Sequence, residues 1–122
     1  MRDEALYLDD ILEAGQQLQR FLNGVREEKF LEDDLLQSAV LQKLTVIGEA
    51  AARVSEATKI RYPQINWKSI VGFRNIAVHV YYELDWKIVW KTATSQIETL
   101  STRVAEIIEN DFPMPDEAFN DQ

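Results

Sequence analysis

The sequence predicts an all-α protein that folds as an antiparallel four-helix bundle. Apolar residues recur every three or four positions along most of the 122 residues, which is the spacing of one face of a helix. No segment alternates apolar and polar residues as a half-buried strand does. The turn-forming pairs Asn23-Gly24 and Tyr62-Pro63 interrupt the helical pattern, and short connections favour antiparallel neighbours.

The first two helices follow from this pattern. We expect the first over about residues 3–23, with Gly24 in the left-handed conformation just after it. Residues 25–32 are expected to connect the first helix to the second and have room for one short turn. The second helix is long and should cover about residues 33–60. Gly48 lies inside that second helix, where glycine lowers helix propensity, so we expect a packing reason for it.

The later helices are defined by their expected caps. Pro63 ends the second helix, because the residue before proline avoids the helical region. Asn66 is a good N-cap for a third helix that should reach about residue 79. Asp85 is expected to cap a fourth helix over about 86–109.

Length and composition bound the class of protein. We expect residues 1–112 to form one helical domain and residues 113–122 an acidic, flexible tail. The absence of cysteine and the single histidine argue against disulfides and a zinc site, so no metal or cofactor is expected. No apolar run approaches the ~20 residues of a membrane span, and the charged N-terminus does not resemble a signal peptide. A soluble, cytoplasmic protein is the expectation.

The net charge of −8 is unevenly distributed. Residues 1–35 hold ten acids and four bases, and residues 98–122 hold seven acids and one base, so each end carries −6. Residues 36–97 hold four acids and eight bases, a net charge of +4. The acidic ends are compatible with a purely solubilising role, and the basic middle leaves a local binding site for an anion open, because the field at a site depends on nearby charges more than on the total.

The candidate site lies in that basic middle. It contains Arg74, Asn75, His79 and Tyr81, and His79 is the only histidine of the chain. Histidine exchanges its proton near neutral pH, and the planar guanidinium of arginine suits phosphate. On a regular helix Asn75 and His79 share a face, whereas Arg74 and His79 are about 140° apart. We therefore expect the helix to end or bend near His79.

Alternatives remain open from the residues alone. His79 is either a proton-transfer group or an ordinary surface or capping histidine. Glu49, among small residues of the second helix, either faces solvent or pairs with Arg74 as a supporting residue. RNA cleavage without a metal needs both a base and an acid. A two-fold dimer would turn the single histidine into the required pair.

Several segments resemble one known family in the same order. Arg74-Asn75-x-x-x-His79-x-Tyr81 matches the R-x4-H-x-Y signature of HEPN proteins. The stretch Leu41–Ala51 resembles the corresponding helix of the HepT-like branch. Further similarity is found in Tyr62-Pro63-Gln64-Ile65-Asn66-Trp67, in Ile70–Asn75 and in Asp85-Trp86-Lys87-Ile88-Val89-Trp90. The resemblance covers about residues 5–110.

The resemblance implies a toxin of a toxin–antitoxin pair, active as a dimeric, metal-independent endoribonuclease. The expected products are 2′,3′-cyclic phosphate and 5′-hydroxyl ends. Arg74 would bind the scissile phosphate, Asn75 would accompany it, and His79 would be the general acid/base. The implied partner is an MntA-like minimal nucleotidyltransferase antitoxin, which transfers AMP to Tyr81. The homodimer is compatible with a higher hetero-oligomer that contains this antitoxin.

Two other functions are compatible with the same sequence. One is a non-catalytic helical module that binds and regulates a nucleotidyltransferase, which the acidic ends and the small residues of the second helix would suit. The other is a purely structural helical dimer, in which substitution of Arg74 or His79 by alanine would change no functional assay.

Overall fold

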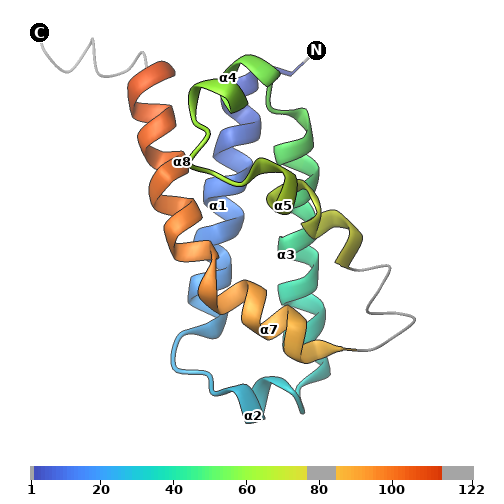
Figure 1. Ribbon diagram of the computed structural model, residues 1–122. Coiled ribbons are helices and arrows are strands. Elements are labelled where there is room, and N and C mark those ends of the chain that lie inside the picture. The colour runs from blue at the N-terminus through green and yellow to red at the C-terminus, as the bar shows by residue number, and fades with distance from the viewer. Residues whose placement is uncertain (1, 77–84, 114–122) are drawn as a thin grey trace, which may run out of the picture.

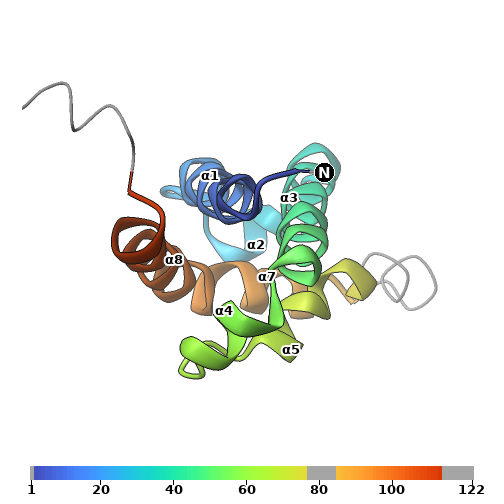
Figure 2. The same ribbon diagram turned by 90° about the horizontal axis from the view of Figure 1, so that it is seen from above.

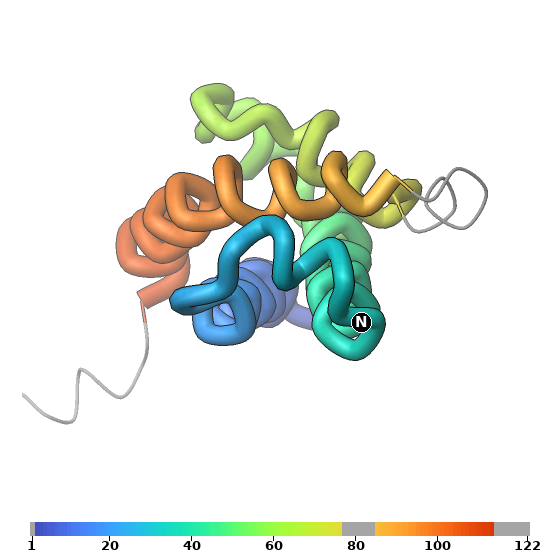
Figure 3. Tube along the Cα trace, turned by 90° about the horizontal axis from the view of Figure 1, so that it is seen from below, coloured from blue at the N-terminus to red at the C-terminus, as the bar shows by residue number. Residues whose placement is uncertain are grey.

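The computed structural model describes residues 2–76 and 85–113 (Figure 1). The described residues form helices and no strand, which confirms the predicted fold class. Helix α1 (Glu4–Leu22) runs antiparallel to α3 (Asp34–Arg53) and to α8 (Ile97–Asp111), and it packs against both. Helix α7 (Trp86–Ser95) crosses this group near one end and contacts all three, as the view from below shows (Figure 3).

Short helical segments join these longer helices. Helix α2 (Glu27–Phe30) connects α1 to α3 at one end of the bundle. Helices α4 (Glu56–Arg61) and α5 (Trp67–Val71) lie on the side of the bundle away from α1, as seen from above (Figure 2). Because α5 packs against α3, the chain that follows it is held beside the middle of the long helix.

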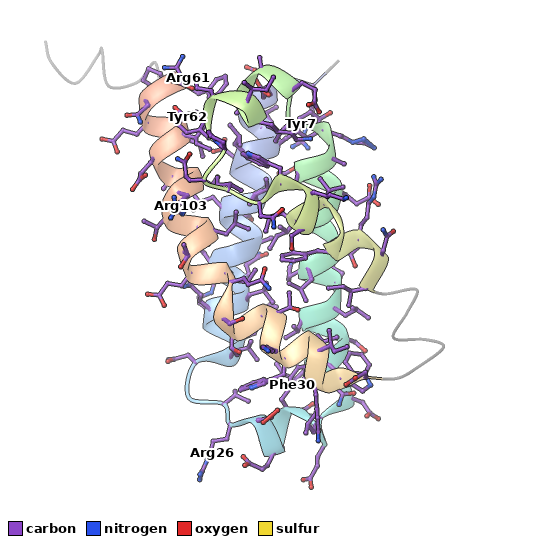
Figure 4. All side chains as sticks on the ribbon, viewed as in Figure 1. Tyr7, Arg26, Phe30, Arg61, Tyr62 and Arg103 are labelled. Atoms are coloured by element: carbon purple, nitrogen blue, oxygen red, sulfur yellow. The ribbon has the colours of Figure 1, made fainter. Side chains whose placement is uncertain are left out.

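The core lies between the long helices and is closed at one end by an aromatic cluster. Its fully buried side chains come from α1, α3, α7 and α8: Leu8, Ile11, Leu18, Val40, Leu44, Ile47, Val89, Ile97, Val104 and Ile107. Phe30 of α2 is also fully buried, with its ring centroid 5.3 Å from Trp90 and 6.3 Å from Trp86 of α7 (Figure 4). These indoles therefore pack into the fold, and they close the end of the core where α2 meets α7.

The start of the chain agrees with the sequence-based prediction. Helix α1 lies within one residue of the expected bounds at each end, and Gly24 has the predicted left-handed conformation with φ of 74°. The expected short turn in residues 25–32 is helix α2. Asp33 caps α3, its carboxylate accepting a hydrogen bond from the backbone N–H of Leu36 at 3.0 Å.

The second predicted helix, 33–60, was wrong in one respect, because the structure divides it into α3 and α4. Val54 is extended (φ −67°, ψ 139°), and Ser55 caps α4 by accepting a hydrogen bond from the N–H of Thr58 at 3.2 Å. The carboxylate of Glu4 on α1 accepts hydrogen bonds from the backbone N–H of Ser55 and from the hydroxyl of Thr58. The first of these bonds satisfies the backbone N–H of Ser55, which a continuous helix would have used internally.

The break lets α4 reach the far end of α8. Tyr62, which follows α4, donates its hydroxyl hydrogen to the Asp111 carboxylate at 2.9 Å, and Arg61 forms an ion pair with the same carboxylate at 3.3 Å. Figure 4 shows Arg61 and Tyr62 beside the C-terminal end of α8. The α4 segment is thereby fastened at both of its ends.

The fourth predicted helix, 86–109, was also wrong as a single element. It is divided at Gln96 into α7 and α8, which point in different directions (Figure 1). Thr94 and Ser95 each donate a side-chain hydrogen bond to the carbonyl four residues earlier, a bonding pattern that often bends helices. Asp85 is the N-cap residue of α7 as expected, but its carboxylate makes no capping hydrogen bond.

Candidate active site

Arg74 and Asn75 lie on a short helical stretch beside α3. Asn66 caps α5 as predicted, accepting a hydrogen bond from the N–H of Ser69 at 3.1 Å. Gly72 ends α5, and residues 73–76 are helical again. Phe73 is buried in the core, whereas Arg74 and Asn75 are exposed. Burial of Phe73 therefore fixes the rotation of this stretch so that the arginine and the asparagine point to solvent.

Two of the predicted site residues, His79 and Tyr81, lie outside the described residues. So do the expected bend near His79 and its shared face with Asn75. Their roles stay predictions. The structure does place the two segments that flank them, because the stretch ending at Ile76 and the beginning of α7 at Trp86 are both described.

Glu49 is exposed, and no ion pair joins it to Arg74, although the structure describes both residues. Glu49 instead lines an open pocket of about 200 Å³ between α1 and α3, together with Arg2, Tyr7 and Arg53. Of the two alternatives for Glu49, the structure therefore shows the solvent-facing one, and Glu49 does not support Arg74 through an ion pair.

The pocket that Glu49 lines is a poor phosphate site. Arg2 is bound by the Asp10 carboxylate at 2.6 Å and lies over the ring of Tyr7, with its guanidinium carbon 5.1 Å from the ring centroid. The hydrogen bond to Asp10 raises the pKa of Arg2. Because one of its two arginines is already neutralised, this pocket favours a structural role, and the exposed Arg74 outside it is the better candidate for binding an anion.

Further exposed bases lie on the two helices, α5 and α7, that precede and follow the segment containing Arg74. Lys68 of α5 and Lys87 and Lys91 of α7 are exposed, and both helices pack against α3. The ion pairs among the described residues involve other bases, which are Arg2, Lys29, Lys59 and Arg61. We call Lys68, Arg74, Lys87 and Lys91 the basic set. It offers four positive charges to a polyanion.

The basic set was not singled out by sequence reasoning, which counted its lysines only within the net charge of the middle segment. One available signal was the spacing of Lys87 and Lys91. Residues four apart lie on the same face of a helix, so these two lysines form one strip along α7. The relation of that strip to Lys68 and Arg74 depends on the packing of α5 and α7 against α3, which no local pattern reveals.

The described residues also limit other kinds of site. Residues 2–76 and 85–113 contain no group of three histidine, cysteine, aspartate or glutamate side chains placed to hold a metal ion. None of the helices in those ranges combines the length and the apolar character required to cross a bilayer.

An all-helical domain that exposes the arginine and asparagine of an R-x4-H-x-Y motif defines the class of protein, a HEPN-like helical domain. A family model described as "Ribonuclease HepT-like" matches residues 11–107. The chain therefore belongs to the ribonuclease HepT-like family, which confirms the resemblance found in the sequence.

Curated relatives agree with the family. The "Probable ribonuclease HepT" of Thermococcus cleftensis is 32% identical over 101 residues, which cover 83% of this chain and 92% of the relative. A "Putative RNase" of Methanocaldococcus jannaschii is 29% identical over 103 residues, covering 84% and 94%. Another, from Caldanaerobacter subterraneus, is 29% identical over 111 residues, covering 91% and 99%. No solved structure matches this chain.

Proposed function

We propose that this chain is the toxin of a toxin–antitoxin pair and acts as a metal-independent endoribonuclease. The observation that carries the proposal is the exposure of Arg74 and Asn75 within the region that matches the ribonuclease family. Arg74 is held on a helical stretch whose neighbour Phe73 is buried. A guanidinium carried on a fixed backbone is suited to binding phosphate, because its planar fork matches the phosphate oxygens and little backbone freedom is lost on binding.

The proposed reaction is an internal transesterification of RNA. The 2′-oxygen of one nucleotide attacks the adjacent phosphorus as a base removes its proton, and the P–O bond to the 5′-oxygen breaks as an acid supplies a proton. The products are a 2′,3′-cyclic phosphate and a 5′-hydroxyl, and no water is consumed. Arg74 stabilises the negative charge that develops on the phosphate, and His79 supplies the proton transfers.

The second part of the proposal is that two chains form each catalytic site, because each chain has one histidine. A base and an acid are needed in the same step, and a two-fold dimer brings two copies of His79 together with two copies of Arg74. The basic set then extends the site along the RNA backbone, since Lys68, Lys87 and Lys91 are exposed and can neutralise phosphates beyond the scissile one.

The third part of the proposal concerns control. The partner in this proposal is a minimal nucleotidyltransferase. It transfers AMP from ATP to the hydroxyl oxygen of Tyr81, two residues after His79, and pyrophosphate leaves. The transferred group adds bulk and a negative phosphate beside the groups that bind RNA. Repulsion and occlusion would then switch the ribonuclease off.

Arg74→Ala tests the proposed ribonuclease in the presence of EDTA. We expect it to lower the rate of RNA cleavage by about 10²–10³-fold, because a positive group that stabilises the developing charge is lost. Arg74 is exposed, so the free energy of unfolding should change by no more than about 0.5 kcal/mol. The rate is measured with a fluorogenic RNA, and stability is measured by urea unfolding.

Arg26→Ala is the matched control. Arg26 is also exposed, and it lies beside α2 at one end of the bundle, where Figure 4 shows it projecting into solvent. Its removal takes away the same charge and should leave cleavage within about twofold of the original chain. Equal cleavage by Arg74→Ala and the original chain would contradict the role proposed for Arg74. Absence of cleavage by the original chain itself would contradict the proposed ribonuclease and would favour the non-catalytic module that regulates a nucleotidyltransferase.

A further inference from the structure

Gly48 of α3 meets the backbone that carries Arg74. A Cβ atom built on Gly48 would overlap the backbone nitrogen of Arg74. It would also lie 3.1 Å from the Cβ of Arg74 and 3.1 Å from the carbonyl oxygen of Val71. Atoms of the main chain cannot rotate away as the end of a side chain can. Any side chain at position 48 therefore requires the stretch from Val71 to Arg74 to move outward from α3.

The other buried helical glycine offers a direct comparison. Gly15 of α1 faces α8, where an added Cβ would overlap the hydroxyl oxygen of Ser101. That oxygen is the end of a side chain and can turn about a single bond. Both glycines are buried within helices. Only Gly48 is in contact with the backbone of a candidate site residue.

We infer that Gly48 is a positioning residue for Arg74, an inference that rests on the proposed ribonuclease function. Phe73 sets the rotation of the short helical stretch through its burial. Gly48 sets how closely that stretch approaches α3, because the two backbones touch at this point. Together they fix the position of the Arg74 backbone, and so the base of its side chain, relative to the bundle. The packing reason that the sequence leads us to expect for Gly48 is thus a contact with the site itself.

Gly48→Ala tests this role. The added methyl should displace the backbone of Arg74, and misplacing a substrate-positioning group by about 1 Å can lower a rate by ~10²-fold. We expect cleavage to fall by about 10- to 100-fold while the helical circular dichroism spectrum is retained. Gly15→Ala is the matched control, because it adds the same methyl to a buried helical glycine. It should leave cleavage per folded molecule within about twofold of the original chain.

A double-mutant cycle separates positioning from general stability. If Gly48 acts through Arg74, adding Gly48→Ala to Arg74→Ala should lower the residual rate no further. If Gly48→Ala lowers the rate only by unfolding part of the protein, the double variant should lose activity by the product of the two separate factors. Rates are therefore divided by the folded fraction, which is taken from the thermal melting curve of each variant.

Each outcome decides the inference. An equal fall in both backgrounds, or a folded Gly48→Ala variant with the original rate, would overturn it. Failure of Gly48→Ala to fold at any temperature would overturn it as well, since Gly48 would then serve the whole bundle. If the original chain itself does not cleave RNA, the proposed ribonuclease fails instead, so the two failures are distinguishable.

Discussion

Replacing His79 by alanine is expected to lower RNA cleavage by about 10⁴-fold, the largest effect of any single substitution in this chain. General acid–base catalysis contributes about 10²–10⁴-fold, and His79 is the only histidine. In a two-fold dimer the substitution removes the base and the acid together, so the loss should lie at the upper end of that range. The measurement is the single-turnover cleavage rate with saturating protein.

A mixing experiment tests the composite character of the site. If each site needs the histidines of both chains, a dimer of one original and one His79→Ala chain is inactive. Co-refolding the original chain with an excess of His79→Ala should then suppress its activity, whereas the same excess of Arg26→Ala should not. Unchanged activity per original chain in the mixture would show that one histidine is sufficient.

Modification of Tyr81 is expected to have the second-largest effect. Incubation with the proposed nucleotidyltransferase partner and ATP should add AMP to the chain and reduce cleavage to the background rate, because a phosphate beside the proposed RNA-binding groups would repel the substrate. Intact mass measures the addition, and the cleavage assay measures its consequence.

Tyr81→Phe is the control for that modification. It removes the hydroxyl that accepts AMP and keeps the aromatic ring. This variant should cleave RNA at close to the original rate and should resist inhibition by the nucleotidyltransferase and ATP. If Tyr81→Phe is still inhibited and its mass is unchanged, the inhibition would come from binding of the partner and not from covalent modification.

The helical content of the fold could be predicted because it depends on local patterns. The apolar spacing defined α1, and Asn66 marked the start of α5. The division between α3 and α4 depends instead on Glu4, which lies 51 residues before Ser55 and accepts its backbone hydrogen bond. Such a long-range contact leaves no signal in the sequence around Ser55.

The division between α7 and α8 was hidden for a different reason. Val89, Ala93 and Ile97 are all buried and continue one apolar stripe across Gln96, and no glycine or proline interrupts it. The chain changes direction while its apolar face remains in phase. Periodicity reports which face is buried, and it does not report a change in the direction of the helix axis.

The candidate site was predictable in part. The inward phase of Phe73 implies that its neighbours Arg74 and Asn75 point outward, and the structure shows this arrangement. The backbone contact of Gly48 with Arg74 could be anticipated only as an unspecified close approach, since the partner of a small residue depends on tertiary packing. The proposed composite site with His79 depends on how two copies would associate, which local sequence patterns do not reveal.

The ends of the RNA products test the central proposal most directly. Purified original chain is incubated with a defined RNA in excess EDTA, alongside Arg74→Ala purified in the same way. The account predicts fragments with 2′,3′-cyclic phosphate and 5′-hydroxyl ends from the original chain and almost none from the variant. Absence of cleavage in EDTA with activity restored by Mg²⁺, or fragments carrying 5′-phosphates, would contradict it.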